Sequence, residues 1–207
     1  MYIPKAHLVD DRAFLHDFMD EYPFVVLVTA APEIRITHIP VLLERGARDY
    51  GTIRGHISRQ NPQAAAFDGK QAAVIVFRGP HSYISPAWYA KTDVVPTWNF
   101  AVVHASGKLN AITEKERLRE LLTKLIKKFE SPDSPAYELS RLPESYTSGM
   151  MGGIIGFEMR VEKLEGKFKL GQERSEDDRQ GILRNVGTAK TGRPMRDLTA
   201  SFYARGR

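Results

Sequence analysis

Residues 51–62 read GTIRGHISRQNP and contain the pattern that decides the fold. In the first eight of these residues, small or aliphatic side chains stand at the odd positions and polar side chains stand at the even positions. This period of two predicts a strand over residues 49–58 with one side toward a core and one polar side. Asn61 and Pro62 then supply an N-cap and a proline at the first helical position, which predicts a short helix.

Short apolar segments elsewhere in the chain point to the same class of fold. They are separated by turn residues and lie at residues 24–29, 33–43, 72–77 and 98–106. Parallel sheets need helical crossovers between their strands, and the chain lacks the regular alternation of strand and helix that these would give. The sequence therefore predicts a mainly β fold, an antiparallel barrel of Greek-key type with peripheral helices.

The alternation breaks between residues 157 and 170. The apolar residues from 157 to 161 are odd-numbered, whereas those from 164 to 170 are even-numbered. A regular strand cannot present both sets to one core, because successive side chains point to opposite faces. We therefore expect a hairpin or a bulge between residues 162 and 166, with Glu165 and Gly166 as the turn.

Two longer helices are predicted. The first covers residues 11–21. The second follows Thr113 and Glu116, which have the spacing of a capping box, and its leucines repeat at helical spacing as far as Phe129. A helix-turn-helix would need an adjacent partner helix across a tight turn, and none is found, so we expect this second helix to cover the barrel rather than read DNA.

The composition excludes several classes of protein. The 207 residues include no cysteine, which removes disulfides, thiolate nucleophiles and thiolate metal sites. No segment approaches the roughly 20 apolar residues of a membrane-spanning helix, and the first residues contain no apolar signal core. We expect a cytoplasmic protein without a membrane segment.

The net charge of +5 is concentrated near the C-terminus. Residues 180–207 carry six basic residues and one acidic residue, which accounts for all of the net charge. A basic segment can hold the phosphates of a nucleic acid, or it can be a solvated C-terminal tail. Both interpretations stay open.

Familiar catalytic signatures are missing, so no catalytic residue is assigned. The sequence contains no dinucleotide-binding glycine motif, P-loop, zinc-protease motif or nucleophile elbow. The histidines are scattered without metal-ligand spacing, and no metal site is expected.

The end of the strand over residues 49–58 is the first candidate binding site. Ser58 and Arg59 bring a hydroxyl and a guanidinium to the start of the short helix that Asn61 caps. Backbone N–H groups at a helix start carry partial positive charge, and arginine adds a planar two-pronged donor, so the segment can seat a phosphate. It can equally be a strand-to-helix turn with a surface arginine.

The second candidate site is the stretch RGPHSYISPAWY at residues 78–89, followed by VPTWNF at residues 95–100. Both tryptophans and two of the eight tyrosines fall between Tyr83 and Trp98. Flat aromatic and polar groups on a proline-stiffened backbone suit a planar heterocycle. They can equally form an aromatic cluster at a barrel end or at a subunit interface.

These stretches carry a resemblance to a known family. The order of GHISRQNP, RGPHSYISPAWY, VPTWNF and, at residues 156–182, GFEMRVEKLEGKFKLGQERSEDDRQGI is similar to that of the PaiB-type FMN-binding negative transcriptional regulators. The resemblance covers residues 1–185, which it marks as one FMN-binding split-barrel domain. It leaves residues 186–207 as a basic C-terminal tail.

The resemblance implies an FMN-binding split β-barrel that forms a homodimer, with the flavin at the subunit interface. It implies that Ser58 and Arg59 hold the phosphate, and that His38 and Glu44 stand where the wider group has Arg and Lys. The cofactor-binding candidates are His38, His56, Ser58, Arg59, Asn61, His81, Tyr83, Ser85, Lys91 and Trp98.

Three functions stay open at this point. The resemblance implies a regulatory flavoprotein, for which DNA is a conceivable partner although no DNA-reading motif is recognised. The first alternative is a flavin-dependent oxidoreductase acting on a small molecule, in which the flavin itself carries the electron chemistry. The second alternative is a haem-binding split-barrel protein.

Overall fold

The computed structural model describes residues 1–30, 33–46, 50–91, 93–131, 138–188 and 192–205. The chain divides into two compact units. The larger unit comprises Arg12–Phe77 and His104–Leu164, and the smaller unit comprises Met1–Asp11, Arg78–Val103 and Glu165–Arg207. Each unit has its own buried core, and each is described by itself below.

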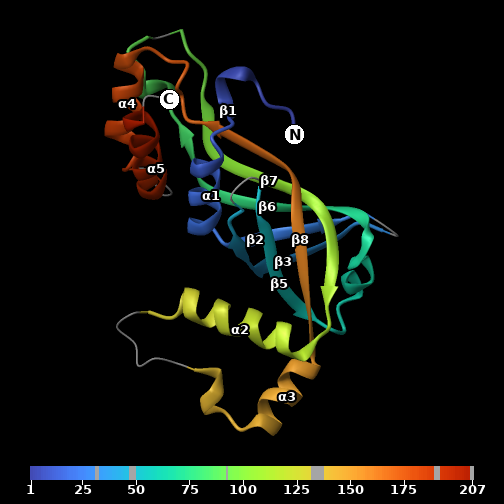
Figure 1. The fold of residues 1–207 in the computed structure, drawn as a ribbon. Coiled ribbons are helices and arrows are strands. Elements are labelled where there is room, and N and C mark those ends of the chain that lie inside the picture. Colours follow the sequence, from blue (N-terminus) through green and yellow to red (C-terminus); the bar gives the residue numbers. More distant parts are fainter. Residues whose placement is uncertain (31–32, 47–49, 92, 132–137, 189–191, 206–207) are drawn as a thin grey trace. The chain divides into compact units, whose positions relative to one another are not determined.

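The described strands form one sheet (Figure 1). They are β1 (Leu8–Val9), β2 (Phe24–Thr29), β3 (Arg35–Pro40), β4 (Leu42–Glu44), β5 (Thr52–Ser58), β6 (Asp68–Ile84), β7 (Thr97–Ile112) and β8 (Ile154–Lys169). The sheet order is β3-β2-β6-β7-β8-β5-β4, and β1 pairs with β8. The pairs β1–β8, β2–β3, β2–β6, β4–β5 and β5–β8 are antiparallel, which confirms the predicted antiparallel class.

Five α-helices and four short 3-10 helices accompany the sheet in the described residues. The α-helices are α1 (Arg12–Glu21), α2 (Lys115–Phe129), α3 (Glu144–Gly152), α4 (Glu176–Val186) and α5 (Gly192–Ala204). The 3-10 helices are η1 (Lys5–His7), η2 (Pro62–Ala66), η3 (Pro86–Trp88) and η4 (Leu139–Arg141). None of the described helices combines the length and the apolar composition that crossing a membrane requires.

The predicted hairpin with its turn at Glu165 and Gly166 is wrong, because β8 runs without interruption from Ile154 to Lys169, whereas the predicted alternative, a bulge, is compatible with a continuous strand. The change of phase is nevertheless present, since buried side chains are odd-numbered from 157 to 161 and even-numbered from 166 to 170. The division into units falls between Leu164 and Glu165. The two sets of apolar residues therefore belong to the cores of two different units, and a single strand supplies both.

Helix α2 packs against the larger unit, as its amphipathic pattern predicts. Its residues Leu118, Leu121 and Leu125 are buried in a cluster with Leu42, Ile112 and Met151. Five of the six basic residues of α2 pair with carboxylates of the same unit, in the pairs Lys115–Glu144, Arg117–Glu158, Arg119–Glu144, Lys124–Glu44 and Lys128–Asp20. These basic side chains are already paired within the unit, which agrees with a helix that covers the barrel.

The predicted capping box of α2 is wrong. The helix begins at Lys115 and its N-cap is Glu114, which makes no side-chain capping hydrogen bond. Thr113 therefore stands one position before the cap, and Glu116 stands at the second helical position instead of the third. The spacing of the box is present, but the chain enters the helix one residue later.

Residues 186–207, expected as a basic tail, include the helix α5 in their described part. Met195 and Phe202 are buried, and the ring of Phe202 stacks on that of Phe168 with centroids 5.9 Å apart. The hydroxyl of Tyr203 donates to the carbonyl oxygen of Leu170 at 2.6 Å. Helix α5 thus adds to the core of the smaller unit, and α4 and α5 lie side by side (Figure 1).

Candidate functional site

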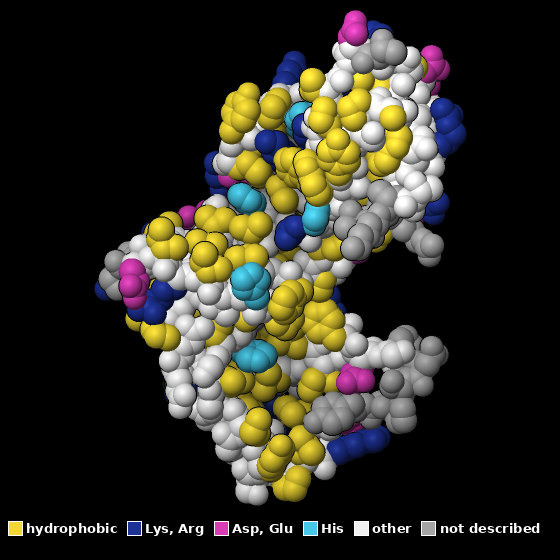
Figure 2. Space-filling model, turned by 180° about the vertical axis from the view of Figure 1, so that it is seen from behind, with side chains coloured by type: hydrophobic (Ala, Val, Ile, Leu, Met, Phe, Trp, Pro, Cys, Tyr) yellow, Lys and Arg dark blue, Asp and Glu magenta, His cyan; other side chains and the backbone are white. Residues whose placement is uncertain are grey.

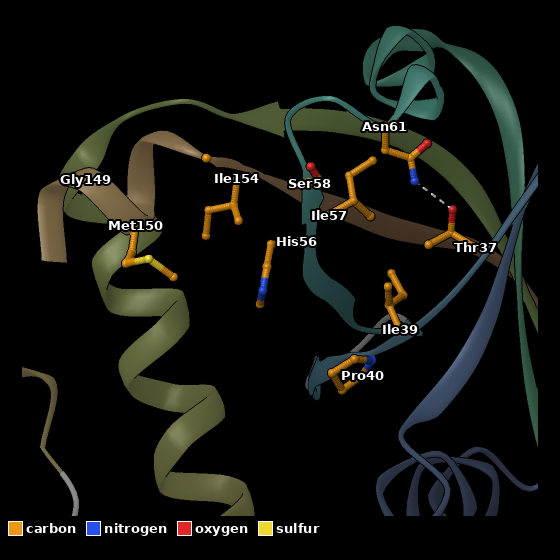
Figure 3. A pocket seen from close by; sticks show the side chains of 11 residues that line it. Thr37, Ile39, Pro40, His56, Ile57, Ser58, Asn61, Gly149, Met150 and Ile154 are labelled. Carbon is orange, nitrogen blue, oxygen red and sulfur yellow. Dashed lines mark hydrogen bonds between the residues drawn. The ribbon is translucent and has the colours of Figure 1, made fainter. Parts of the chain in front are cut away.

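The larger unit contains a pocket of about 480 Å³, which we call the Ser58 pocket. It lies between strands β3 and β5, the start of β8 and the end of helix α3 (Figure 3). Its lining residues are Thr37, Ile39, Pro40, His56, Ile57, Ser58, Asn61, Gly149, Met150, Gly153 and Ile154. The volume falls in the range of roughly 300–1,000 Å³ that is typical of small-molecule sites.

The polar corner of the Ser58 pocket is fixed by Asn61, which caps η2 as the sequence predicts. Its side-chain oxygen accepts from the backbone N–H of Gln63 at 2.9 Å, and its amide nitrogen donates to the Thr37 hydroxyl at 3.0 Å (Figure 3). The buried amide of Gln63 in turn donates to the carbonyl oxygens of Leu27 and Arg35. The turn after β5 is thereby held to β2 and β3.

His56 lines the Ser58 pocket and carries a buried polar atom. Its Nδ1 atom is buried and has no hydrogen-bond partner among the described residues. Burial lowers the pKa of the His56 imidazole, so the ring is held in its neutral form. A buried polar atom without a partner lowers the stability of the folded protein.

Arg59 is directed differently from what the phosphate-seat prediction assumes. Its Nε donates to the carbonyl oxygen of Gly152 at 3.0 Å, and its Nη2 donates to that of Ile154 at 2.9 Å. Its backbone N–H donates to the carbonyl oxygen of Gly153 at 2.9 Å. Arg59 is not among the residues that line the pocket, and it binds the chain at the end of α3, which forms one wall.

Only three of the five candidate residues in the larger unit therefore line the pocket. His56, Ser58 and Asn61 line the Ser58 pocket, Arg59 stands at its wall, and His38 is exposed on β3 outside the lining. The sequence analysis missed Thr37, Ile39 and Pro40 as lining residues, although the alternation along β3 could have separated Thr37 and Ile39 from His38. It also missed Gly149 and Met150, because the glycines of α3 give its sequence no clear helical pattern.

The smaller unit contains a second pocket of about 240 Å³, which we call the Trp98 pocket. Its lining residues are Arg78, Gly79, His81, Trp98, Phe100, Ala101 and Val102. The ring centroids of His81 and Trp98 are 5.7 Å apart, and Tyr83 meets Trp98 edge-on at 6.2 Å. The structure thus brings three of the predicted residues, His81, Tyr83 and Trp98, into one aromatic cluster.

Ser85 and Lys91 line neither of these two pockets. The Ser85 hydroxyl accepts from the backbone N–H of Ala87 at 3.3 Å and so caps η3, whereas Lys91 is exposed. The loop between them is held by α4, because the Asp178 carboxylate accepts from the backbone N–H of Ala90 at 2.8 Å. No group of three potential metal ligands occurs among the described residues.

The fold is shared with solved structures of split-barrel proteins. The flavocytochrome Anf3 from Azotobacter vinelandii matches with a TM-score of 0.61 at 11% identity, covering 81% of this chain and 72% of that chain. The FAD and heme binding protein from Mycobacterium smegmatis matches with a TM-score of 0.59 at 13% identity, covering 86% and 80%. This likeness shows the fold, a split β-barrel, as predicted.

The sequence comparisons then define the family. Residues 1–163 match the family described as "Putative FMN-binding domain", and this chain belongs to that family. The protein named protease synthase and sporulation protein PAI 2, from Bacillus subtilis, is 33% identical over 187 residues, which cover 90% of this chain and 89% of that protein. The predicted PaiB-type resemblance and the predicted cofactor, FMN, are confirmed at the level of the family.

Proposed function

We propose that this chain binds FMN in the Ser58 pocket. The observation that carries the proposal is the pocket itself, which joins an apolar wall of Ile39, Ile57 and Met150 to polar side chains, those of His56, Ser58 and Asn61. A flavin has a large planar ring with a polar edge, and this combination of surfaces suits it. The flavin, once bound, supplies the electron chemistry.

Ser58 and Arg59 are proposed to hold the phosphate at the rim of this pocket. The Ser58 oxygen accepts from the backbone N–H of Gln60 at 3.3 Å, and its own O–H remains available to donate. Arg59 uses two of the five N–H donors of its guanidinium in hydrogen bonds to Gly152 of α3 and to Ile154 at the start of β8. Its remaining donors can meet a phosphate without releasing the helix.

Two glycines of α3 provide the test. An added Cβ would meet nothing within 4 Å at Gly149, which lines the pocket, or at Gly152, which does not. We expect Gly149→Leu to fill the pocket and to weaken FMN binding at least tenfold in a fluorescence titration of the flavin-free protein, the loss of about 1.4 kcal/mol or more. Gly152→Leu is the matched control and should bind FMN as the wild type does. Equal affinity in both variants would place the flavin elsewhere.

The predicted homodimer is part of the same proposal, and an exposed sheet face supports it. Phe24 on β2 and Ile36 on β3 are 64% and 57% exposed, and strand pairing sets Phe24 opposite Pro40 and Val28 opposite Ile36 on one face. Exposed hydrophobic side chains also gather on the side seen in Figure 2. Large exposed apolar side chains on one face of a sheet are a feature of interaction sites.

Pro40 connects this face with the cofactor proposal. It is exposed, it pairs with Phe24 in the sheet, and it also lines the Ser58 pocket. A second copy of the chain that covers Phe24 and Ile36 would therefore close the rim of the pocket. This supports a flavin held at the interface between two subunits.

A regulatory flavoprotein in the cytoplasm is the biological role that we propose, because the sequence resembles the PaiB-type regulators along most of its length. The family match favours flavin over the haem alternative. Reduction of the bound flavin by NADH or NADPH, with turnover of an acceptor, would instead establish the oxidoreductase alternative. Salt-sensitive promoter binding by the purified protein would establish DNA as a direct partner.

A further inference from the structure

We propose that the Trp98 pocket is a second ligand site, separate from the FMN site, for a small planar carboxylate with a single aromatic ring. The pocket measures about 240 Å³, which is below the range of roughly 300–1,000 Å³ for larger ligands and fits one ring. All of its lining residues belong to the smaller unit. The sequence analysis treated its aromatic residues as part of the flavin site.

The walls of the Trp98 pocket provide surfaces for a ring. The Trp98 side chain is 50% exposed, so part of its indole is free to be covered. His81 and Tyr83 contact that indole from β6, and Phe100 and Val102 add apolar surface from β7. Aromatic rings pack favourably in offset or edge-to-face arrangements on such surfaces.

The positive charge at the Trp98 pocket favours a negatively charged ligand. Arg78 is exposed, and its Nη2 contacts the Nε2 of His81 at 2.5 Å. No carboxylate is paired with Arg78 among the described residues, and the pocket lining contains no acidic side chain. Lys167 does not line the pocket, and its Nζ donates to the carbonyl oxygen of Tyr2 at 3.1 Å, so Arg78 carries the positive charge of the lining.

The shape of the guanidinium narrows the class of anion to a carboxylate. Only one N–H of Arg78 contacts His81, which leaves an edge of the fork free. Arginine binds planar carboxylates through two parallel hydrogen bonds, and the adjacent rings would hold an aromatic group in the same plane. Ring and carboxylate together fit the pocket better than either group alone.

Benzoate is the probe, and Trp98 is the reporter. The chain has two tryptophans, so the variant Trp88→Phe leaves Trp98 as the single source of tryptophan fluorescence. We expect a saturable change of Trp98 fluorescence with benzoate, matched by a shift of its indole N–H signal in NMR. Benzamide, which lacks the charge, and acetate, which lacks the ring, should bind at least about tenfold more weakly.

Three variants test whether benzoate binds in the Trp98 pocket. In the same background, Arg78→Gln should weaken benzoate binding at least about tenfold, and Val102→Phe should block the pocket by filling it. Arg184→Gln, at an exposed arginine of α4 outside the pocket, should leave the affinity unchanged. Circular dichroism should show that all three variants are folded.

Four results would overturn the inference. They are the absence of saturation in both signals, equal binding of benzoate and benzamide, an unchanged affinity in Arg78→Gln, and the loss of benzoate binding on saturation with FMN. Benzoate binding should also persist when the protein is saturated with FMN. If FMN abolishes it, the Trp98 pocket belongs to the flavin site and the separate site does not exist, whereas failure of FMN to bind at all would leave the benzoate result intact.

Discussion

Arg59 and Gly152 are joined by a hydrogen bond of 3.0 Å from the guanidinium Nε to the carbonyl oxygen. This bond links the residue that follows β5 to the last residue of α3, which lie far apart in the sequence. Because α3 contributes Gly149 and Met150 to the Ser58 pocket, Arg59 stabilises one wall of that pocket. A residue that the sequence predicts as a phosphate ligand thus also has a structural role.

The two roles of Arg59 can be separated with FMN and riboflavin, which differ by the phosphate. If Arg59 binds the phosphate, Arg59→Ala should weaken FMN binding by about 1.5–3 kcal/mol, the usual contribution of a hydrogen bond to a charged group. Riboflavin should be affected much less, since it carries no phosphate. Titrations of the flavin-free protein measure both affinities.

Arg141→Ala, at an exposed arginine of the same unit outside the pocket lining, is the control and should bind both flavins normally. An equal loss of FMN and riboflavin affinity in Arg59→Ala would mean that Arg59 acts through α3 alone. The phosphate assignment would then be withdrawn.

His56 predicts a dependence of stability on pH in the flavin-free protein. Burial lowers the pKa of its imidazole in the folded state, so the unfolded chain binds a proton more readily. The free energy of unfolding should therefore fall as the pH drops below the ordinary histidine pKa of 6.5 toward the lowered folded value. His56→Gln should show a smaller fall than the wild type in urea unfolding measured at several pH values. Identical pH profiles would show that His56 is not the group responsible.

Gly181 in α4 should not tolerate a side chain. A Cβ at this position would lie 2.0 Å from the carbonyl oxygen of Trp88, so backbone would have to move. We expect Gly181→Ala to lower the free energy of unfolding by about 1–3 kcal/mol. Gly149→Ala, where the space is open, should instead raise it by about 0.5–1 kcal/mol, because alanine favours a helix over glycine. Chemical denaturation of both variants gives the comparison, and a neutral Gly181→Ala would contradict the packing of α4 on η3.

The exposed face of β2 and β3 predicts the effect of a charge on assembly. Phe24→Glu places a carboxylate on a side chain that is 64% exposed, so the folded monomer should tolerate it. The dimer should dissociate, because the interface would have to bury an unpaired charge. Sedimentation velocity should give a monomer for Phe24→Glu and a dimer for the wild type. Glu130→Gln, at an exposed residue following α2, is a surface control that should remain dimeric. A dimer that survives Phe24→Glu would exclude this face as the interface.

The sequence located the strands but not all of their bounds, since the segment predicted at 33–43 forms two strands and β6 extends beyond 72–77 at both ends. β2 has the predicted bounds, and β5 begins three residues inside the predicted start. The length of β8 could not be predicted, because its apolar residues change phase where the strand passes from one unit to the other. Helix α5 was missed because a basic composition conceals the few apolar residues that pack, among them Met195 and Phe202.

The sequence did not predict how the candidate residues are distributed over the structure. The sequence analysis assigned Ser58 and His81 to a single pocket. The order of the motifs along the sequence does not reveal which structural unit contains each motif. The structure assigns them to different pockets in different units. The hydrogen bonds from Arg59 to the end of α3 and the start of β8 could not be predicted from the sequence either. Their acceptors are backbone carbonyl groups, which every residue type carries.

A crystal structure of the protein grown with FMN is the most direct measurement. We predict flavin density against Ile39, Ile57 and Met150, with the phosphate within hydrogen-bonding distance of the Ser58 hydroxyl. Flavin bound at another place, with the Ser58 pocket filled only by solvent, would contradict the account even though the chain belongs to an FMN-binding family.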